Sequence, residues 1–251
     1  MLHVIGFARI VFQHQLGKNG RDATSQMKLA VLSDFDGTVT LNDTFENVLA
    51  RFGKGDWRTV DEQYVRGEIT LEECVRRQGA MVRVSSSQIL GYLDGVTEFR
   101  PNFDKLIEFC QANHFPIVIV SAGLDFVIKH FLTREMFRDK VELCAASAKA
   151  TPTGIKFKWP KPKSNRSMNF KDDMVRYYKQ KADSVAYVGD GRWDLHALRS
   201  ADRRFVIRNS KLAELCKEQE IQATTIIDFQ EVVISLQKQM SERDIRKGNS
   251  E

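Results

Sequence analysis

Apolar and polar positions alternate between two kinds of pattern along most of the chain. Short, continuous apolar runs favour strands buried on both faces, whereas apolar residues at every third or fourth position favour helices. Strand character is found in residues 29–33, 116–123 (PIVIVSAG), 141–146, 184–191 (SVAYVGDG) and 204–207. Helical spacing is found in residues 103–112, 125–132, 170–179 and 194–200. Strands that alternate with helices predict right-handed crossovers, and therefore an α/β fold whose parallel sheet is covered by helices on both faces.

Residues 44–93 interrupt this alternation directly after the first predicted strand. They have helical periodicity and no strand signal, which predicts a small α-helical cap inserted into the core. The catalytic core would then consist of residues 27–43 and 94–238. The alternating residues 155–159 precede two prolines, Pro160 and Pro162, so we expect a hairpin at an edge of the sheet.

The two ends of the chain do not share the pattern of the core. Residues 1–26 combine a short apolar stretch with a polar run, and they lack the uniform apolar core and cleavage site of a signal peptide. A mitochondrial-type presequence stays open, but the preferred interpretation is a poorly ordered extension without chemistry. Residues 239–251 are charged, which favours a frayed tail.

Composition narrows the possible class of protein. The 251 residues are 42% hydrophobic and 28% charged, which excludes disorder and coiled coil, and no apolar run approaches the length of a membrane span. The net charge of +5 suits a small anionic ligand as well as nucleic acid. The four cysteines, Cys74, Cys110, Cys144 and Cys216, lie far apart in the sequence. This spacing argues against paired zinc ligands and favours reduced thiols, as expected in the cytoplasm.

Polar residues with metal-binding chemistry follow the predicted strands. Asp34 and Asp36 come after the first strand, Ser121 ends the second, and Asp190 and Asp194 follow a later one. Ligands bind at the carboxyl ends of strands in open α/β sheets, so we expect these side chains to converge. Carboxylates this close together require a cation or a proton between them, and oxygen ligands suit Mg²⁺.

Each of these short motifs is common in ordinary loops, but they occur together and in order. The segments DFDGTVT, VSAG, NFKDD and GDGRWDL resemble the four motifs of the haloacid dehalogenase superfamily of aspartate-nucleophile phosphatases. The resemblance covers residues 27 to about 227. It implies a Rossmann-like core, the helical-cap subclass, Mg²⁺ as cofactor and a small phosphorylated metabolite as substrate.

The resemblance also implies a role for each matched residue. Asp34 would be the nucleophile, and Asp36 the general acid and then the base. Ser121 and Lys171 would hold the phosphoryl oxygens. The implied metal ligands are Asp34, the Asp36 main-chain carbonyl, Asp190 and, directly or through water, Asp194. Thr38 and Gly123 are further candidates for substrate binding, because they offer a hydroxyl and free amides.

Two groups within the superfamily compete for the substrate. Phosphoserine phosphatases have a glutamate where this chain has Asp43, and their cap arginine falls at Gln78. They have asparagine where this chain has Trp193. The methionine-salvage phosphatases that act on 2-hydroxy-3-keto-5-methylthiopentenyl 1-phosphate match better, including an arginine at Arg77. We therefore expect Asp43, Arg76, Arg77 and Gln78 to face the cleft and to select the substrate.

Other classes of function fit less well. A dehalogenase that attacks carbon needs neither Asp36 as an acid nor a metal cluster. Nucleic-acid binding would rest on surface lysines and arginines without an accompanying motif, so no nucleic-acid partner and no membrane partner is expected. An inactive binding protein is disfavoured, because each reactive position of the motifs is filled. The sequence leaves the oligomeric state open.

Overall fold

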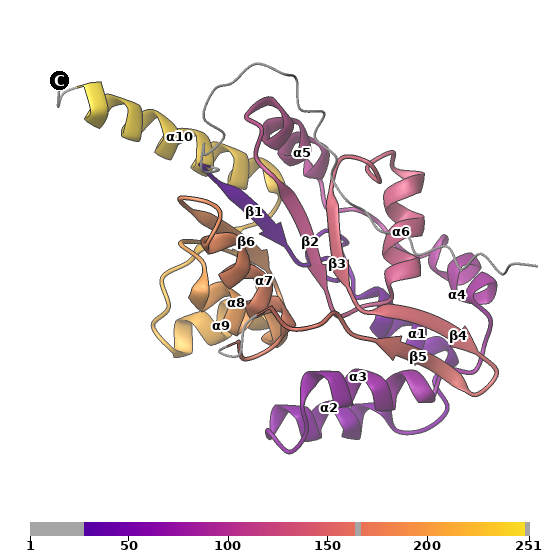
Figure 1. Ribbon diagram of the computed structural model, residues 1–251. Coiled ribbons are helices and arrows are strands. Elements are labelled where there is room, and N and C mark those ends of the chain that lie inside the picture. Colours follow the sequence, from indigo (N-terminus) through magenta and orange to yellow (C-terminus); the bar gives the residue numbers. More distant parts are fainter. Residues whose placement is uncertain (1–27, 164–166, 249–251) are drawn as a thin grey trace, which may run out of the picture.

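The core of the protein is a six-stranded sheet whose neighbouring strands are all parallel. The computed structural model describes residues 28–163 and 167–248, so the expectation for residues 1–26 lies outside the described part. The strands run in the order β3-β2-β1-β6-β7-β8, of which Figure 1 labels β3, β2, β1 and β6. They are β1 (Ala30–Ser33), β2 (Ile117–Ser121), β3 (Glu142–Ala145), β6 (Val185–Gly189), β7 (Arg203–Ile207) and β8 (Thr224–Ile226). The predicted parallel α/β core is confirmed, and the short β8 is an addition to it.

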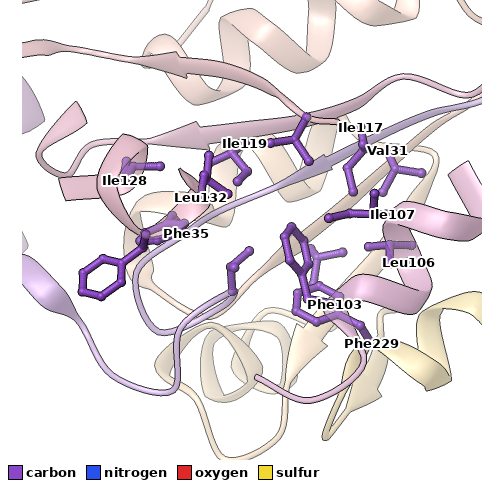
Figure 2. Close-up of a cluster of buried hydrophobic side chains, with 14 of the residues drawn as sticks. Val31, Phe35, Phe103, Leu106, Ile107, Ile117, Ile119, Ile128, Leu132 and Phe229 are labelled. Carbon is purple, nitrogen blue, oxygen red and sulfur yellow. The ribbon is translucent and has the colours of Figure 1, made fainter. Parts of the chain in front are cut away.

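Helices cover both faces of the sheet. One face packs against α5 (Phe103–Ala112), α6 (Asp125–Arg134) and α10 (Phe229–Gly248). The other packs against α7 (Phe170–Lys179), α8 (Leu195–Ser200) and α9 (Lys211–Glu218). Figure 2 shows strand and helix side chains meeting in the first of these layers. Successive strand residues point to opposite faces, so the continuous apolar runs supply both layers. Each fully buried aliphatic or phenyl side chain contributes about 1.5–3 kcal/mol.

A helical insertion follows β1. Its helices are α1 (Thr44–Phe52), α2 (Trp57–Val65), α3 (Leu71–Ala80) and α4 (Ser86–Leu93). Each begins at a residue whose side chain accepts a hydrogen bond from a backbone N–H three residues on. These capping residues are Asp43, Asp56, Thr70 and Ser85. Such caps satisfy N–H groups that the first helical turn leaves unpaired, which explains where the helices start.

The expected edge hairpin lies elsewhere. Strands β4 (Ser147–Thr151) and β5 (Gly154–Lys158) form a separate antiparallel pair (Figure 1). The pair packs against α3, where the Phe157 ring lies over Gly79, and Ile155 is buried. The alternating apolar residues of β5 therefore cover the cap helix rather than extend the main sheet. Insertion and hairpin together form the cap.

The final helix is longer than the sequence pattern indicated. Residues 239–248, expected to belong to a frayed tail, continue α10. A charged run without proline is compatible with a helix as well as with a frayed tail, so polarity alone did not distinguish these two structures. Among the helices in residues 28–163 and 167–248, none combines the length and apolar character needed to span a bilayer.

Candidate active site

Three carboxylates meet where β1 and β6 end. Carboxylate oxygens of Asp34, Asp190 and Asp194 lie within 4.8 Å of one another. The backbone N–H of Asp34 donates to Val188 O at 2.9 Å, which holds the loop after β1 beside β6. Gly37 has φ +74°, and a Cβ there would lie 2.3 Å from Asp190 Oδ2. Only glycine allows this loop to approach Asp190 so closely.

Lys171 connects the nucleophile candidate to the loop after β6. It lies in the first turn of α7, is buried, and places Nζ 2.8 Å from Asp34 Oδ1 and 2.7 Å from Asp194 Oδ1. Burial alone would lower the pKa of Lys171, but the charges of Asp194 and Asp34 raise it above its usual range. The lysine is therefore a fixed positive charge in the site.

Asp194 is held on both of its oxygens by protein groups. Oδ1 accepts from Lys171 and, at 2.6 Å, from the Tyr187 hydroxyl, and Oδ2 accepts from the backbone N–H groups of Asp190 and Gly191. The residue lies in a short 3-10 helix, η1 (Arg192–Asp194), and is fully buried. This arrangement suits a group that fixes Lys171 and the loop of Asp190 and Gly191.

Asp36 has a different environment from Asp34. Its Oδ1 accepts from both the N–H and the hydroxyl of Thr44, and its Oδ2 accepts from Ser121 Oγ at 3.3 Å. A Cβ on Gly123 would lie 2.2 Å from Asp36 Oδ2, so the small residue leaves room for the carboxyl. Burial raises the pKa of Asp36 above its usual value. A carboxyl that retains its proton can act as a general acid.

Thr38 lies behind the site rather than in the cavity wall. Its hydroxyl donates to Asp190 Oδ1 at 2.7 Å, so it positions a carboxylate, and it is absent from the residues that line the cavity. The guanidinium of Arg100 holds the same loop by donating to the carbonyls of Gly37 and Thr38, each at 2.8 Å. Sequence reasoning missed Arg100, because it belongs to no motif and lies 62 residues from Thr38.

A cavity of about 350 Å³ opens between the core and the cap over these groups. From the core, its walls include Asp34, Asp36, Ser121, Gly123, Lys171 and Asp190. Asp43 and Gln78 line it from the cap side, where the sequence placed them. Asp194 is buried beneath the wall.

The structure does not bring Arg77 to this cavity. Its guanidinium pairs with Glu73 at 2.5 Å and donates to Gln63 Oε1 at 3.2 Å, and it is absent from the cavity wall. Consecutive helical residues point about 100° apart, so only part of the run from Arg76 to Gln78 can face the cleft. Gln78 is the buried member, and its side-chain amide donates to Trp57 O at 3.3 Å.

The remaining cap residues in the wall are mostly apolar and were not predicted as a set. They are Phe45, Leu49, Trp57, Val65 and Val75, with Glu46 and Asp61 among them. The core adds Arg192, Trp193 and Lys211. A helical apolar stripe has the same sequence signature whether it faces a core or a cleft, so only the packing of the cap distinguishes the two.

The three carboxylates fit a divalent metal. They offer hard oxygen ligands, and Lys171 already pairs with two of them. Burial and the charge of Asp194 raise the pKa of Asp190 to about 7, which is the behaviour of clustered acids without a compensating cation. Mg²⁺ prefers such ligands and usually retains waters and substrate phosphate.

The site thus combines paired aspartates, a buried lysine and a cluster of hard oxygen ligands at the end of a parallel α/β sheet, beneath a cap. The haloacid dehalogenase-like hydrolase family matches residues 31–199, more than half of the chain. The chain therefore belongs to this family of hydrolases.

Characterised relatives are distant in sequence. A 2-hydroxy-3-keto-5-methylthiopentenyl-1-phosphate phosphatase of Bacillus mycoides is 24% identical over 84% of this chain and 96% of its own length. The bifunctional enzyme MtnB/MtnX of Bacillus licheniformis is 26% identical over 82% of this chain, which spans 48% of that enzyme. The fold is similar to the structure titled phospho-aspartyl intermediate analogue of phosphoserine phosphatase, with TM-score 0.63, 15% identity and coverage of 84% and 99%.

Proposed function

We propose that the protein hydrolyses a small phosphomonoester through an aspartyl-phosphate on Asp34, and that its substrate resembles that of the methionine-salvage phosphatases. The observation that best supports this reaction is the convergence of Asp34, Lys171 and Asp190 at the floor of the cavity beneath the cap. A cytoplasmic location and the absence of nucleic-acid partners belong to the same proposal.

The first step is attack on phosphorus by a carboxylate oxygen of Asp34. Lys171 lies 2.8 Å from Asp34 Oδ1, so it fixes the orientation of this carboxylate and offsets negative charge on the phosphoryl oxygens. Ser121 Oγ, which accepts from Gly123 N–H at 2.9 Å, can turn its own hydrogen toward a phosphoryl oxygen. The P–O bond to the alcohol breaks as the bond to Asp34 forms.

Asp36 transfers protons in both steps. Burial raises the pKa of Asp36, which favours the protonated form that can donate to the departing alkoxide oxygen. The carboxylate that remains then accepts a proton from the water that attacks the aspartyl-phosphate, so phosphate leaves and Asp34 is regenerated. The backbone N–H and the hydroxyl of Thr44 hold Asp36 over the phosphoryl site throughout.

Asp34, Asp190 and the Asp36 main-chain carbonyl would hold Mg²⁺, with Asp194 in support. When bound, the ion neutralises charge on the transferring phosphoryl group. Thr38 and Arg100 maintain this geometry from behind, because they fix Asp190 and the carbonyls of the Gly37–Thr38 turn.

The cap side of the cavity wall favours an apolar leaving group over phosphoserine, and the cations Arg192 and Lys211 line the core side. Cap residues in the wall are apolar or acidic apart from Gln78, and among the described residues no cap lysine or arginine lines the cavity. The carboxylate of phosphoserine would therefore find no cation on the cap side. A methylthio group, in contrast, packs favourably on apolar and aromatic surface.

Phosphate release from a panel of substrates tests the proposal. The panel contains 2-hydroxy-3-keto-5-methylthiopentenyl 1-phosphate, phosphoserine, pyridoxal phosphate, phosphoglycolate and p-nitrophenyl phosphate. We expect Mg²⁺-dependent turnover that EDTA abolishes and that Asp34→Asn lacks, with the highest kcat/KM for the methylthio compound. No release from any of these esters would refute the phosphatase assignment, and a preference for phosphoserine would refute the substrate.

A further inference from the structure

Trp193 joins the cap to the core across the cavity. Its indole stacks on Tyr64 of α2 with the ring centroids 4.1 Å apart and the planes inclined by 4°. Tyr64 belongs to the cap, whereas Trp193 belongs to η1, in the loop that carries Asp190 and Asp194. Parallel aromatic stacking of this kind fixes the relative position of the two rings.

The backbone of Trp193 is also anchored from the core side. Asn169, which caps α7 two residues before Lys171, donates from its side-chain amide to the Trp193 carbonyl at 3.2 Å. Trp193 lines the active-site cavity, whereas Tyr64 does not, so Tyr64 supports one face of the indole from behind. The ring is therefore a preorganised part of the wall.

The same side of the cavity presents further apolar surface. Trp57 and Val65, at the two ends of α2, line the cavity together with Trp193. Asp34 and Lys171 hold the phosphoryl end, so the alcohol portion of a substrate must extend into the space bounded by this surface. Aromatic walls favour unbranched apolar chains and thioethers.

We infer that Trp193 is a specificity-determining residue, whose indole, held by Tyr64, selects phosphomonoesters with an unbranched apolar or thioether tail. This inference rests on the proposed hydrolysis at Asp34 and deepens it, because it assigns recognition of the leaving group to the loop that also carries the metal ligands. Tyr64 acts as a positioning residue.

A homologous series of alkyl phosphates, from ethyl to pentyl, tests this inference by the dependence of kcat/KM on chain length. For the native protein we expect an increase of up to about fourfold per methylene, the equivalent of about 0.8 kcal/mol per buried CH₂. Trp193→Ala should reduce the increase to less than about twofold, Trp193→Phe should largely restore it, and Tyr64→Ala should give an intermediate value. 3-(Methylthio)propyl phosphate should behave like pentyl phosphate or better.

Two controls separate recognition from a structural role. Tyr92, a cap tyrosine whose ring packs on Phe52 and does not line the cavity, provides the matched variant Tyr92→Ala, which should keep the native chain-length dependence. Inhibition by orthovanadate, which occupies only the phosphoryl position, should be unchanged in Trp193→Ala. Where Trp193→Ala fails to fold, the comparison of Tyr64→Ala with Tyr92→Ala carries the test.

Equal losses for all chain lengths in Trp193→Ala, or unchanged dependence in Trp193→Ala and Tyr64→Ala, would overturn the inference. So would a native protein that hydrolyses these esters without any dependence on chain length. A native protein that hydrolyses none of them, p-nitrophenyl phosphate included, would instead refute the proposed function.

Discussion

Asp34 and Asp36 lie two residues apart but have different partners. Asp34 contacts Lys171, and Asp36 is held by Thr44 and Ser121. Replacing each of the two carboxyls should therefore have a different effect on turnover. Asp34→Asn should abolish turnover of every ester, because an amide is a poor nucleophile toward phosphorus.

Asp36→Asn should slow alkyl ester hydrolysis by about 10²–10⁴-fold, the usual contribution of general acid–base catalysis. p-Nitrophenolate leaves without a proton, so p-nitrophenyl phosphate should still phosphorylate Asp34, and the intermediate should hydrolyse slowly. Rapid-quench measurement of p-nitrophenolate should show a burst. Equal losses for alkyl and aryl esters without a burst would show that Asp36 is not the acid and base.

Arg77 and Gln78 provide a second contrast between neighbours. Arg77 pairs with Glu73 on the outside of α3, whereas Gln78 lines the cavity. Exposed ion pairs contribute little, so Arg77→Ala should leave kcat/KM within about twofold for all substrates and change stability by less than about 1 kcal/mol. Gln78→Ala should change the ratio of kcat/KM values between substrates. If Arg77→Ala changes the selectivity between substrates and Gln78→Ala does not, Arg77 rather than Gln78 contacts the substrate, and this prediction is wrong.

Single residues also show what the sequence could establish about the site. Aspartates at the ends of parallel strands must converge, so Asp34 and Asp190 could be predicted to lie together. The contacts of Thr44 and Arg100 could not, because they depend on how the cap packs and where the chain re-enters the core. Arg77 was placed wrongly because motif spacing does not fix the rotation of a helix about its axis.

At the scale of elements, the β4–β5 hairpin is the part that the sequence located least well. Its alternating residues predicted a strand pair, but alternation does not say which apolar surface the pair covers. Gly154 has φ +120°, and a Cβ there would lie 2.7 Å from Ala80 Cα in α3. This glycine therefore allows the hairpin to approach the cap helix backbone.

Gly154→Ala should reduce the free energy of unfolding by about 1–3 kcal/mol more than Gly67→Ala, because overpacking adds to backbone strain. Gly67 is the matched control, since it also has positive φ (+74°) but no atom within 4 Å of its Cβ position. Urea unfolding of the two variants measures the difference. Similar decreases in the free energy of unfolding for the two variants would show that Gly154 is not needed for close packing of the hairpin on α3.

For the molecule as a whole, clustered acids predict an unusual dependence of stability on pH. Burial raises the pKa of Asp34, Asp36 and Asp190, the last to about 7. The folded protein therefore retains protons that the unfolded chain releases above pH ~4. Without metal, the free energy of unfolding should decrease as pH rises from about 5 to 8.

Mg²⁺ should reverse this trend, because its ligands must be deprotonated and binding to the folded state alone is stabilising. The increase in Tm on adding Mg²⁺ should be larger at pH 8 than at pH 5, as differential scanning calorimetry can measure. Asp190→Asn should weaken the pH dependence of the metal-free stability and that of the increase in Tm caused by Mg²⁺. A metal-free Tm that rises from pH 5 to 8 would contradict the ionisation behaviour described for these acids.

The cap is joined to the core through a narrow, closed base. Thr40 and Phe99 form an antiparallel bridge, and Arg100 donates from its backbone N–H to Val39 O at 2.7 Å and from its side chain to Thr38 O. The helical insertion therefore leaves and re-enters the core at nearly one point, and hydrogen bonds connect the two chain segments there. Such an insertion is an exchangeable module within two limits: Thr44 must stay because it holds Asp36, and the β4–β5 hairpin must change together with the α3 surface on which it packs. Changes in the cap helices can thus alter the space for the alcohol while Asp34, Lys171 and Asp190 stay in place, and Trp193 is the part of that surface that belongs to the core.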